Sequence, residues 1–308
     1  MARSSRLSKK QKLTILADIE HGYRPFDKHA LKLLQSLLDD SDAEVRAEAI
    51  ACLWLDPDPH WIDVLIHKVN RDVHADVRAH AISALGRYVY EGEIAMDEGW
   101  GSPEVSIHAD DYARVTDFLF GIAQDPEEAL ETRRAALEAL AFRTGDDKVL
   151  DLIAWAYQHK DRRMKVSAIF AMARNGNARW TDIILRELRS TDPEIQHEAI
   201  HAVGELSLFE AAEPLMELIR DKSLPKSLRL LAIYSLGGTG AESAYAFLER
   251  LARSRDRDVR QVAQDAIEEW LLVTQEQMVF EDEPFDDQVT MDTLPSIWND
   301  QFGTFSRN

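Results

Sequence analysis

The stretch PEIQHEAIHAVG at residues 193–204 carries a pattern that returns along the chain. Six other stretches share its spacing of apolar and small residues: AEVRAEAIACL (43–53), ADVRAHAISALG (75–86), LETRRAALEAL (130–140), RRMKVSAIFAM (162–172), KSLRLLAIYSLG (226–237) and RDVRQVAQDAI (257–267). All seven have an alanine at the same place: Ala49, Ala81, Ala136, Ala168, Ala199, Ala232 and Ala263. Successive alanines lie 32, 55, 32, 31, 33 and 31 residues apart, and every interval but one matches a single helix-turn-helix unit. The chain is therefore predicted to be a repeat array.

Each of these stretches has the periodicity of an amphipathic helix. An apolar residue begins the helix, and further apolar residues follow four, five and eight positions later, which is the spacing of a core-facing stripe. A second column of small residues lets neighbouring helices approach closely: Cys52, Ala84, Ala139, Ala171, Ala202, Ser235 and Ala266. Another amphipathic segment precedes each stretch. Two antiparallel helices cannot bury their apolar faces alone, so the units are expected to stack into a solenoid.

Polar residues mark the helix starts. Asp42, Asp161, Asp192 and Asp256 each lie three residues before the first apolar position, where a carboxylate can accept hydrogen bonds from the free amides. A column of mainly basic residues directly follows the first apolar position: Arg46, Arg78, Arg133, Lys165, Gln196, Arg229 and Arg260. We expect these cations to pair with the capping aspartates as a ladder between repeats.

The pattern resembles HEAT repeats, specifically the bacterial phycobilisome-lyase-like type, over roughly residues 27–273. The resemblance implies an all-α fold, a right-handed α-α superhelix of about seven helical hairpins with an armadillo-like arrangement. Residues 1–26 are expected to form a basic N-terminal segment or capping helix. The long interval places an insertion at about 89–111, and residues 274–308 are expected to form an acidic tail that contains aromatic residues.

Composition excludes several classes of function. The formal net charge is −19, which disfavours the phosphate backbone of nucleic acids and anionic membranes. The single cysteine, Cys52, rules out an internal disulfide framework and fits a reducing compartment. No segment has the ~18 consecutive apolar residues of a membrane span. We therefore predict a cytoplasmic protein.

The letters HEAIH at 197–201 match the zinc signature in which two histidines one turn apart bind the metal and a glutamate acts as base. Most of the match is repeat register, because Ala199 and Ile200 occupy columns that other units also fill. Only His197, Glu198 and His201 remain, and Ser207 stands where a third ligand would be. The HEAT resemblance also extends to deoxyhypusine hydroxylase, an enzyme that binds two irons with His-Glu pairs from several repeats. In this chain His197-Glu198 has the register of such a pair, but no other repeat has His-Glu at the same position. We predict no metal, no cofactor and no catalytic residue.

Binding residues are expected on the concave surface, which the second helices of HEAT units line. The position six residues after the first apolar residue is filled by Phe170, His201 and Tyr234 in consecutive units, and aromatic side chains on an exposed face are typical of interfaces. With Glu138 and His197 they make up the predicted groove. Trp100 in the insertion, and Phe285 and Trp298 in the tail, are further candidates.

The sequence thus favours a non-catalytic scaffold that binds a protein or peptide with a basic or mixed surface. A chromophore (bilin) lyase or lyase subunit, which the resemblance implies, is the alternative, and a metal-dependent hydroxylase is the third. The oligomeric state is left open.

Overall fold

The computed structural model describes residues 7–98 and 107–282, and these are helical, with fifteen α-helices, short 3-10 turns and no strand. The chain divides after Arg143 into two compact units, called unit 1 and unit 2 below. Among the described helices, none is both long and apolar enough to cross a membrane.

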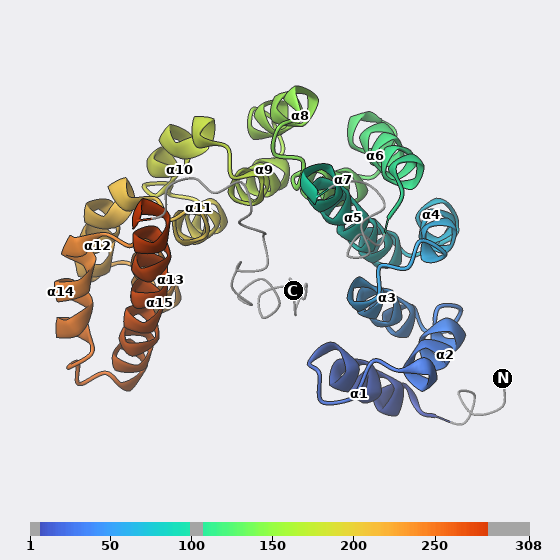
Figure 1. The fold of residues 1–308 in the computed structure, drawn as a ribbon, viewed down its shortest axis with the longest axis horizontal. Helices are drawn as coiled ribbons and strands as arrows, with labels where there is room; N and C mark the ends of the chain where they lie inside the picture. Colours follow the sequence, from blue (N-terminus) through green and yellow to red (C-terminus); the bar gives the residue numbers. More distant parts are fainter. Residues whose placement is uncertain (1–6, 99–106, 283–308) are drawn as a thin grey trace. The chain divides into compact units, whose positions relative to one another are not determined.

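Unit 1 contains three helical hairpins and one preceding helix (Figure 1). Its helices are α1 (Lys9–Glu20), α2 (Lys28–Leu37), α3 (Ala43–Ala51), α4 (Trp61–Arg71), α5 (Ala75–Glu98), α6 (Ala109–Gln124) and α7 (Leu130–Leu140), with a 3-10 turn after α3 (Cys52–Leu55). The second helices of the hairpins pack side by side, α3 on α5 and α5 on α7, and each first helix covers its own second helix. Helix α1 packs on α3 and closes the N-terminal end of this layer.

Unit 2 repeats the arrangement with four hairpins. Its helices are α8 (Asp147–Tyr157), α9 (Arg162–Asn175), α10 (Thr181–Glu187), α11 (Pro193–Glu205), α12 (Ala212–Arg220), α13 (Lys226–Gly238), α14 (Glu242–Leu251) and α15 (Arg257–Asp282), with 3-10 turns before α10 (Ala178–Trp180) and α12 (Phe209–Ala211). The second helices α9, α11, α13 and α15 form one layer and the first helices form the other (Figure 1). The prediction of an all-α fold with about seven hairpins is confirmed.

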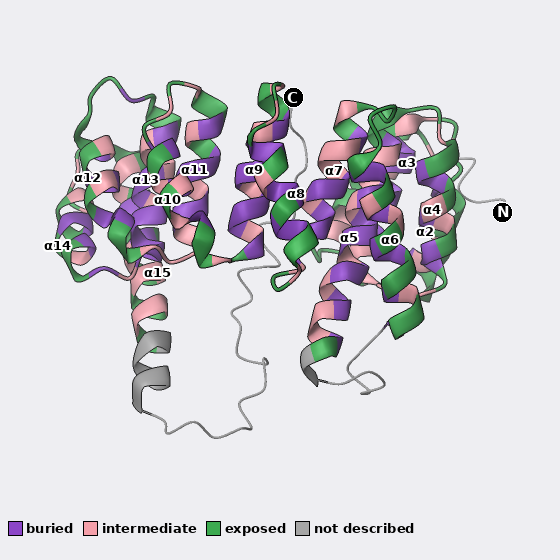
Figure 2. Ribbon diagram, turned by 90° about the horizontal axis from the view of Figure 1, so that it is seen from above, coloured by how far each residue is buried: buried purple, intermediate pink, exposed green. Residues whose placement is uncertain are grey.

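The alanine column lies at the packed centre of this arrangement. All seven repeat alanines have 0% of their surface exposed, as expected of small residues on the packed side of each second helix. Figure 2 shows the same amphipathic pattern in the helices, which bury one side and leave the other in solvent. The regular spacing of alanines therefore marks helix contacts.

The predicted helix caps are confirmed. Asp42 and Asp192 each accept hydrogen bonds from two main-chain amides at the start of their helices, Asp161 accepts one from Arg163, and Asp256 accepts two at the start of α15. These bonds satisfy amides that have no partner inside the helix.

Most side chains of the basic column do not bind the capping aspartates, as the predicted ladder required. Arg46 does bind an acid of the next repeat, Asp72, through two hydrogen bonds of 2.8 Å. Arg78, Arg229 and Arg260 instead donate to main-chain carbonyls at the end of the preceding first helix or in the loop after it, at 2.8–3.0 Å. At this position the side chain reaches back into its own hairpin, where carbonyls lack helical partners.

Lys165 of the same column also binds an acid of the next repeat, Glu187, at 3.1 Å, but more of the ion pairs between repeats come from a different column, the first residue of the helix. Lys9 binds Asp42 and Glu44, Arg162 binds Asp192 and Glu194, and Lys226 binds Asp256 and Asp258. In each case one cation joins the cap and the second helical residue of the next second helix. The sequence prediction was therefore correct about a ladder and wrong about the column that supplies most of it.

Two boundaries differ from the sequence prediction. Helix α5 runs to Glu98 and α6 begins at Ala109, so the segment expected as an insertion at 89–111 begins as a continuation of α5, with Val89 and Ala95 buried. Helix α15 runs to Asp282, beyond residue 273. Trp100, Phe285 and Trp298 lie outside the described residues.

One core position of unit 1 holds an unsatisfied hydroxyl. Thr132 occupies the first apolar column of its repeat, is 1% exposed, and its Oγ1 has no hydrogen-bond partner. A buried hydroxyl without a partner is destabilising, and three other repeats have valine here, Val45, Val77 and Val259. We expect Thr132→Val to raise the free energy of unfolding by about 1 kcal/mol.

The matched control is Thr116, a buried threonine of the same unit whose Oγ1 donates to the Tyr112 carbonyl at 2.9 Å. Thr116→Val is expected to leave stability unchanged or to lower it, because it removes a satisfied hydrogen bond. Urea denaturation followed by circular dichroism compares the two variants. A lower midpoint for Thr132→Val than for the wild-type chain would contradict the prediction.

Candidate functional site

The candidate site lies on the layer of second helices in unit 2, on the side that the first helices leave uncovered. In α9, α11 and α15 two positions face outward, six and ten residues after the first apolar residue, and in α13 only the first of them does, because the second is the buried Gly238. They define the surface called the unit 2 face below: Phe170, Arg174, His201, Glu205, Tyr234, Asp265 and Glu269. Because α9 packs on α11, α11 on α13 and α13 on α15, these side chains come from consecutive neighbouring helices.

The aromatic residues of the face are half-buried and have charged neighbours. The guanidinium of Arg174 lies over the Phe170 ring, 4.4 Å from its centroid. The ring stays partly exposed, so a partner can contact its edge and its other face. On the next helix, His201 Nε2 lies 3.6 Å from Glu205 Oε1. Phe170 and His201 are therefore placed as the sequence predicted, on adjacent helices.

Tyr234 lies among carboxylates. Burial raises the pKa of its phenol, and the negative charges of Glu269, Glu205 and Asp265 raise this pKa further. Two of these acids come from α15 and one from α11, so helices on both sides of α13 contribute to the negative surroundings. The ring and its acidic border together offer apolar contact and negative potential within one small area.

The other predicted groove residues are less closely grouped. His197 is exposed on α11, one helical turn before His201, and its Nδ1 lies 3.7 Å from Glu198 Oε1. Glu138 is half-exposed on α7, which belongs to unit 1, whereas the rest of the predicted groove belongs to unit 2. The site is therefore described within unit 2.

The zinc-like letters HEAIH have a packing explanation. Glu198, which would act as the base, is buried in the helix layer, while His197 points to solvent. Ser207 follows the end of α11 with a left-handed φ of 47°, so it is not on the helical face of the histidines. Within residues 7–98 and 107–282, no three or more His, Cys, Asp or Glu side chains are grouped to hold a metal ion.

Cys52 is a packing residue. Its side chain is buried, its Sγ lies 3.6 Å from the Leu16 carbonyl oxygen, and burial raises the pKa of the thiol to about 12. A thiol with such a pKa is almost fully protonated near neutral pH and is a poor nucleophile. The interpretation of Cys52 as buried filler is confirmed.

Sequence reasoning missed two groups of residues. The acids Glu205 and Glu269 follow the predicted column by one helical turn, so extending the same register by four residues would have found them. In unit 1, the guanidinium of Arg87 lies over the rings of Trp54 and Tyr90, and both rings contact Phe142. Tyr90 lies where α5 continues past the repeat, and a pattern built on repeats carries no signal for such a residue.

Comparisons with known proteins agree with the fold. A family model described as HEAT repeats matches residues 30–97, 149–232 and 181–268, which together make up more than half of the chain. Among curated proteins, no relative matches.

Solved structures with a similar fold belong to several kinds of protein. Human deoxyhypusine hydroxylase in complex with glycerol is 17% identical, with 87% of this chain and 92% of that chain covered and a TM-score of 0.38. The complex of CpcE and CpcF of phycocyanin lyase from Nostoc is 18% identical, with 80% and 93% covered and a TM-score of 0.48. Kap95p bound to RanGDP is 14% identical, with 97% of this chain but 45% of that chain covered and a TM-score of 0.47. At these identities the similarity is one of fold.

Proposed function

Because the chain belongs to the HEAT-repeat family, we propose that it is a non-catalytic scaffold that holds a partner protein or peptide on the unit 2 face. The observation that carries the proposal is that the half-buried rings of Phe170 and Tyr234 alternate with charged side chains on consecutive helices. Aromatic anchors in a partly desolvated setting supply a large share of binding energy at protein interfaces.

The chemistry of the face favours a partner with a basic or mixed surface. Glu205, Asp265 and Glu269 give the surroundings of Tyr234 a negative potential, which attracts lysine or arginine side chains and raises the association rate. Arg174, beside Phe170, adds a positive point at the other end of the face. The partner therefore needs cationic groups opposite α13 and α15 and tolerates an acidic group opposite α9.

The fold lowers the entropic cost of binding. The face is carried by four helices whose packed sides are fully buried, so its backbone is ordered before the partner arrives. Preorganised surfaces lose little conformational freedom on association. His201 comes from the helix between those of the two rings, and His201 and the exposed His197 one turn before it would contribute polar contacts to a partner.

The test is the double variant Phe170→Ala and Tyr234→Ala. The partner is first identified by affinity capture and then purified, and its dissociation constant is measured by calorimetry. We expect the double variant to bind at least about tenfold more weakly, because each ring supplies anchor contacts. Helicity and thermal unfolding should stay close to those of the wild-type chain, since both rings are only half-buried.

The control removes two exposed aromatic residues of unit 2 that lie elsewhere. Trp155 on α8 is 42% exposed and Phe209 before α12 is 63% exposed, and both belong to the side of the first helices. Trp155→Ala with Phe209→Ala is expected to leave affinity unchanged. Equal affinity of the Phe170/Tyr234 variant and the wild-type chain would remove the proposal.

A further inference from the structure

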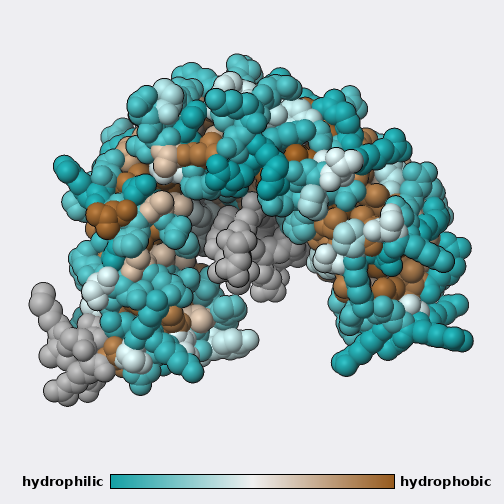
Figure 3. Space-filling view, turned by 180° about the vertical axis from the view of Figure 1, so that it is seen from behind, coloured by the Kyte–Doolittle hydropathy of each residue, from teal (hydrophilic) through white to brown (hydrophobic). Residues whose placement is uncertain are grey.

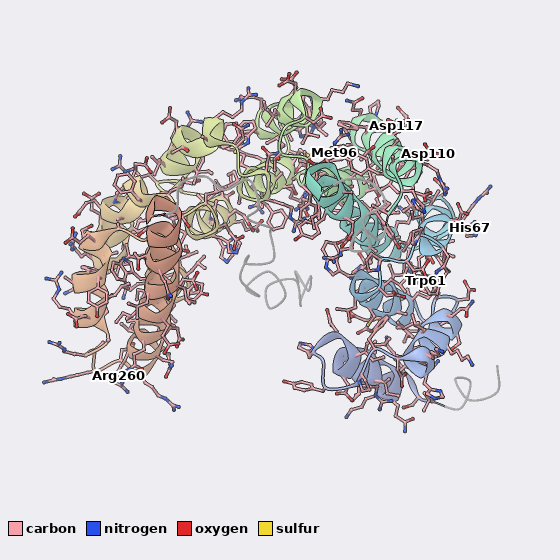
Figure 4. All side chains as sticks on the ribbon, viewed as in Figure 1. Trp61, His67, Met96, Asp110, Asp117 and Arg260 are labelled. Carbon is pink, nitrogen blue, oxygen red and sulfur yellow. The ribbon has the colours of Figure 1, made fainter. Side chains whose placement is uncertain are left out.

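The loop between α14 and α15 is a basic patch on an acidic protein. Five arginines fall within residues 250–260, although the whole chain has a net charge of −19. Arg253, Arg255 and Arg257 are exposed, and among the described residues no carboxylate pairs with any of the three. Figure 4 labels Arg260 at this end of unit 2, where long side chains project beyond the ribbon, and the solvent-facing surface in Figure 3 is mainly hydrophilic.

The acids of this loop already pair with a lysine of the preceding repeat. Asp256 and Asp258 lie between and beside the arginines, but both bind Lys226 of the preceding repeat, at 2.9 and 2.7 Å. Asp256 also accepts hydrogen bonds from the first amides of α15. Because these carboxylates are occupied, the exposed guanidinium groups keep their charge for a ligand outside the loop.

The backbone of the loop is held in place. Arg260 donates to the Ser254 carbonyl at 2.8 Å, and the Asp256 amide donates to Ser254 Oγ at 3.2 Å. Together with the cap of α15, these bonds fix the residues on both sides of Arg255. The three arginines are thus presented from an ordered turn, which lowers the entropic cost of binding.

The position of Arg257 in its repeat indicates which chemical group its side chain binds. Arg162 and Lys226 are also the first residues of second helices, and each binds two carboxylates of the next repeat. Arg257 stands at the same position in α15, and the described part of the chain has no later repeat to supply those carboxylates. Its side chain therefore lacks the acidic pair that its counterparts have.

We propose that Arg253, Arg255 and Arg257 form a second docking site, for an Asp/Glu-rich segment of a partner protein. Guanidinium groups bind carboxylates through two parallel hydrogen bonds, and the internal ladder shows the same pairing between repeats. A nucleic acid is a poorer fit, because the patch is one short turn on a chain of net charge −19 and cannot follow a phosphate backbone.

The experiment uses the full chain and a short fluorescein-labelled peptide of Asp, Glu and Gly residues. We expect anisotropy to show binding that weakens as salt rises, and R253Q/R255Q/R257Q to weaken it about tenfold or more. The control R24Q/K28Q/K32Q removes the same charge from three exposed cations of unit 1 and should leave the affinity within about twofold. This control separates the loop from net charge.

Three results of the binding assays would overturn the proposal: no binding of the peptide, equal loss in both triple variants, or tighter binding of a DNA duplex of matched charge. Self-association that depends on concentration, measured by sedimentation and abolished by R253Q/R255Q/R257Q, would assign the site to the acidic tail of a second copy and also overturn it. The unit 2 face is untouched by these substitutions, so the outcome is independent of the scaffold test.

Discussion

Replacing Gly237 with alanine is expected to destabilise unit 2 by about 3 kcal/mol, near the upper part of the usual range for overpacking. A Cβ atom at this position would lie 2.9 Å from both the Cα and the carbonyl carbon of Ala266 on α15, and closer still to its carbonyl oxygen. These are main-chain atoms of a packed helix, so they cannot turn aside as the end of a side chain can. Helices α13 and α15 would have to move apart.

The sign of this prediction opposes helix propensity. Alanine is favoured over glycine inside a helix by about 1 kcal/mol, so a variant without steric conflict would gain stability. Gly204 provides that comparison, because it has the same place in the preceding repeat and its Cβ would lie 3.3–3.4 Å from Ser235. Gly204→Ala is expected to be nearly neutral.

Urea denaturation and hydrogen exchange measure the two glycine variants. Repeat arrays can lose cooperativity, so exchange of the α15 amides gives the local readout that a global midpoint misses. We expect faster exchange in α15 for Gly237→Ala and unchanged exchange for Gly204→Ala. A Gly237→Ala chain as stable as the wild type would show that the two helices adjust without cost.

Gly237 also illustrates why part of the helix packing could not be predicted from the sequence. The letters GGTG at 237–240 are typical of glycines that close a helix, and Gly240 does have a left-handed φ of 63°. Gly237 and Gly238, however, lie inside α13, where the first meets α15 and the second meets α11. Glycine is found both at helix ends and inside helices where a neighbouring backbone approaches closely. The sequence alone does not distinguish these two roles.

The architecture itself was predictable because it repeats. Seven alanines recur at the same position of the pattern, and so many matches are not expected by chance. The number of matches therefore predicts the number of helical hairpins. The same redundancy explains HEAIH, since Ala199 and Ile200 belong to the register rather than to a metal site. A unique feature has no such support, and the extension of α5 to Glu98 was for that reason expected as an insertion.

The site was only partly predictable for a related reason. Register identifies which residues of a helix face outward, and it placed Phe170, His201 and Tyr234 on adjacent helices. It does not state how far a long side chain reaches. Arg78 bends back to a carbonyl of its own hairpin while Lys226 crosses to the next repeat, and spacing alone assigns both to similar roles.

The ion pair of Arg46 and Asp72 is expected to contribute strongly to the stability of unit 1. The two side chains are only 11% and 6% exposed and share two hydrogen bonds of 2.8 Å across the first and second repeats. Removing one member of a buried pair leaves the other charge without compensation. We expect Arg46→Gln to lower the free energy of unfolding by about 3–5 kcal/mol near neutral pH.

Arg78 is the matched control for this substitution. It stands in the same column of the next repeat and also binds Asp72, but through the main-chain carbonyl, at 3.0 Å. Arg78→Gln removes an arginine and a hydrogen bond while the carboxylate keeps Arg46, so the expected loss is about 1 kcal/mol. The double variant Arg46→Gln with Asp72→Asn should recover part of the loss, because no buried charge remains.

The pH dependence separates the ion pair from general packing. Burial alone would raise the pKa of the Asp72 carboxyl, but hydrogen bonds from Arg46 and the His74 amide bring this pKa below its ordinary value. A lowered pKa in the folded state stabilises the fold above the unfolded value of about 3.9, and this contribution is lost as the pH falls through the folded value. In the Arg46→Gln variant the buried Asp72 carboxylate has lost its cation, so protonation of Asp72 stabilises the folded state. The difference in urea midpoint between wild type and variant should therefore be large at about pH 7 and shrink at about pH 3; a difference that stays constant over this range would mean that Arg46 acts by packing and not by charge.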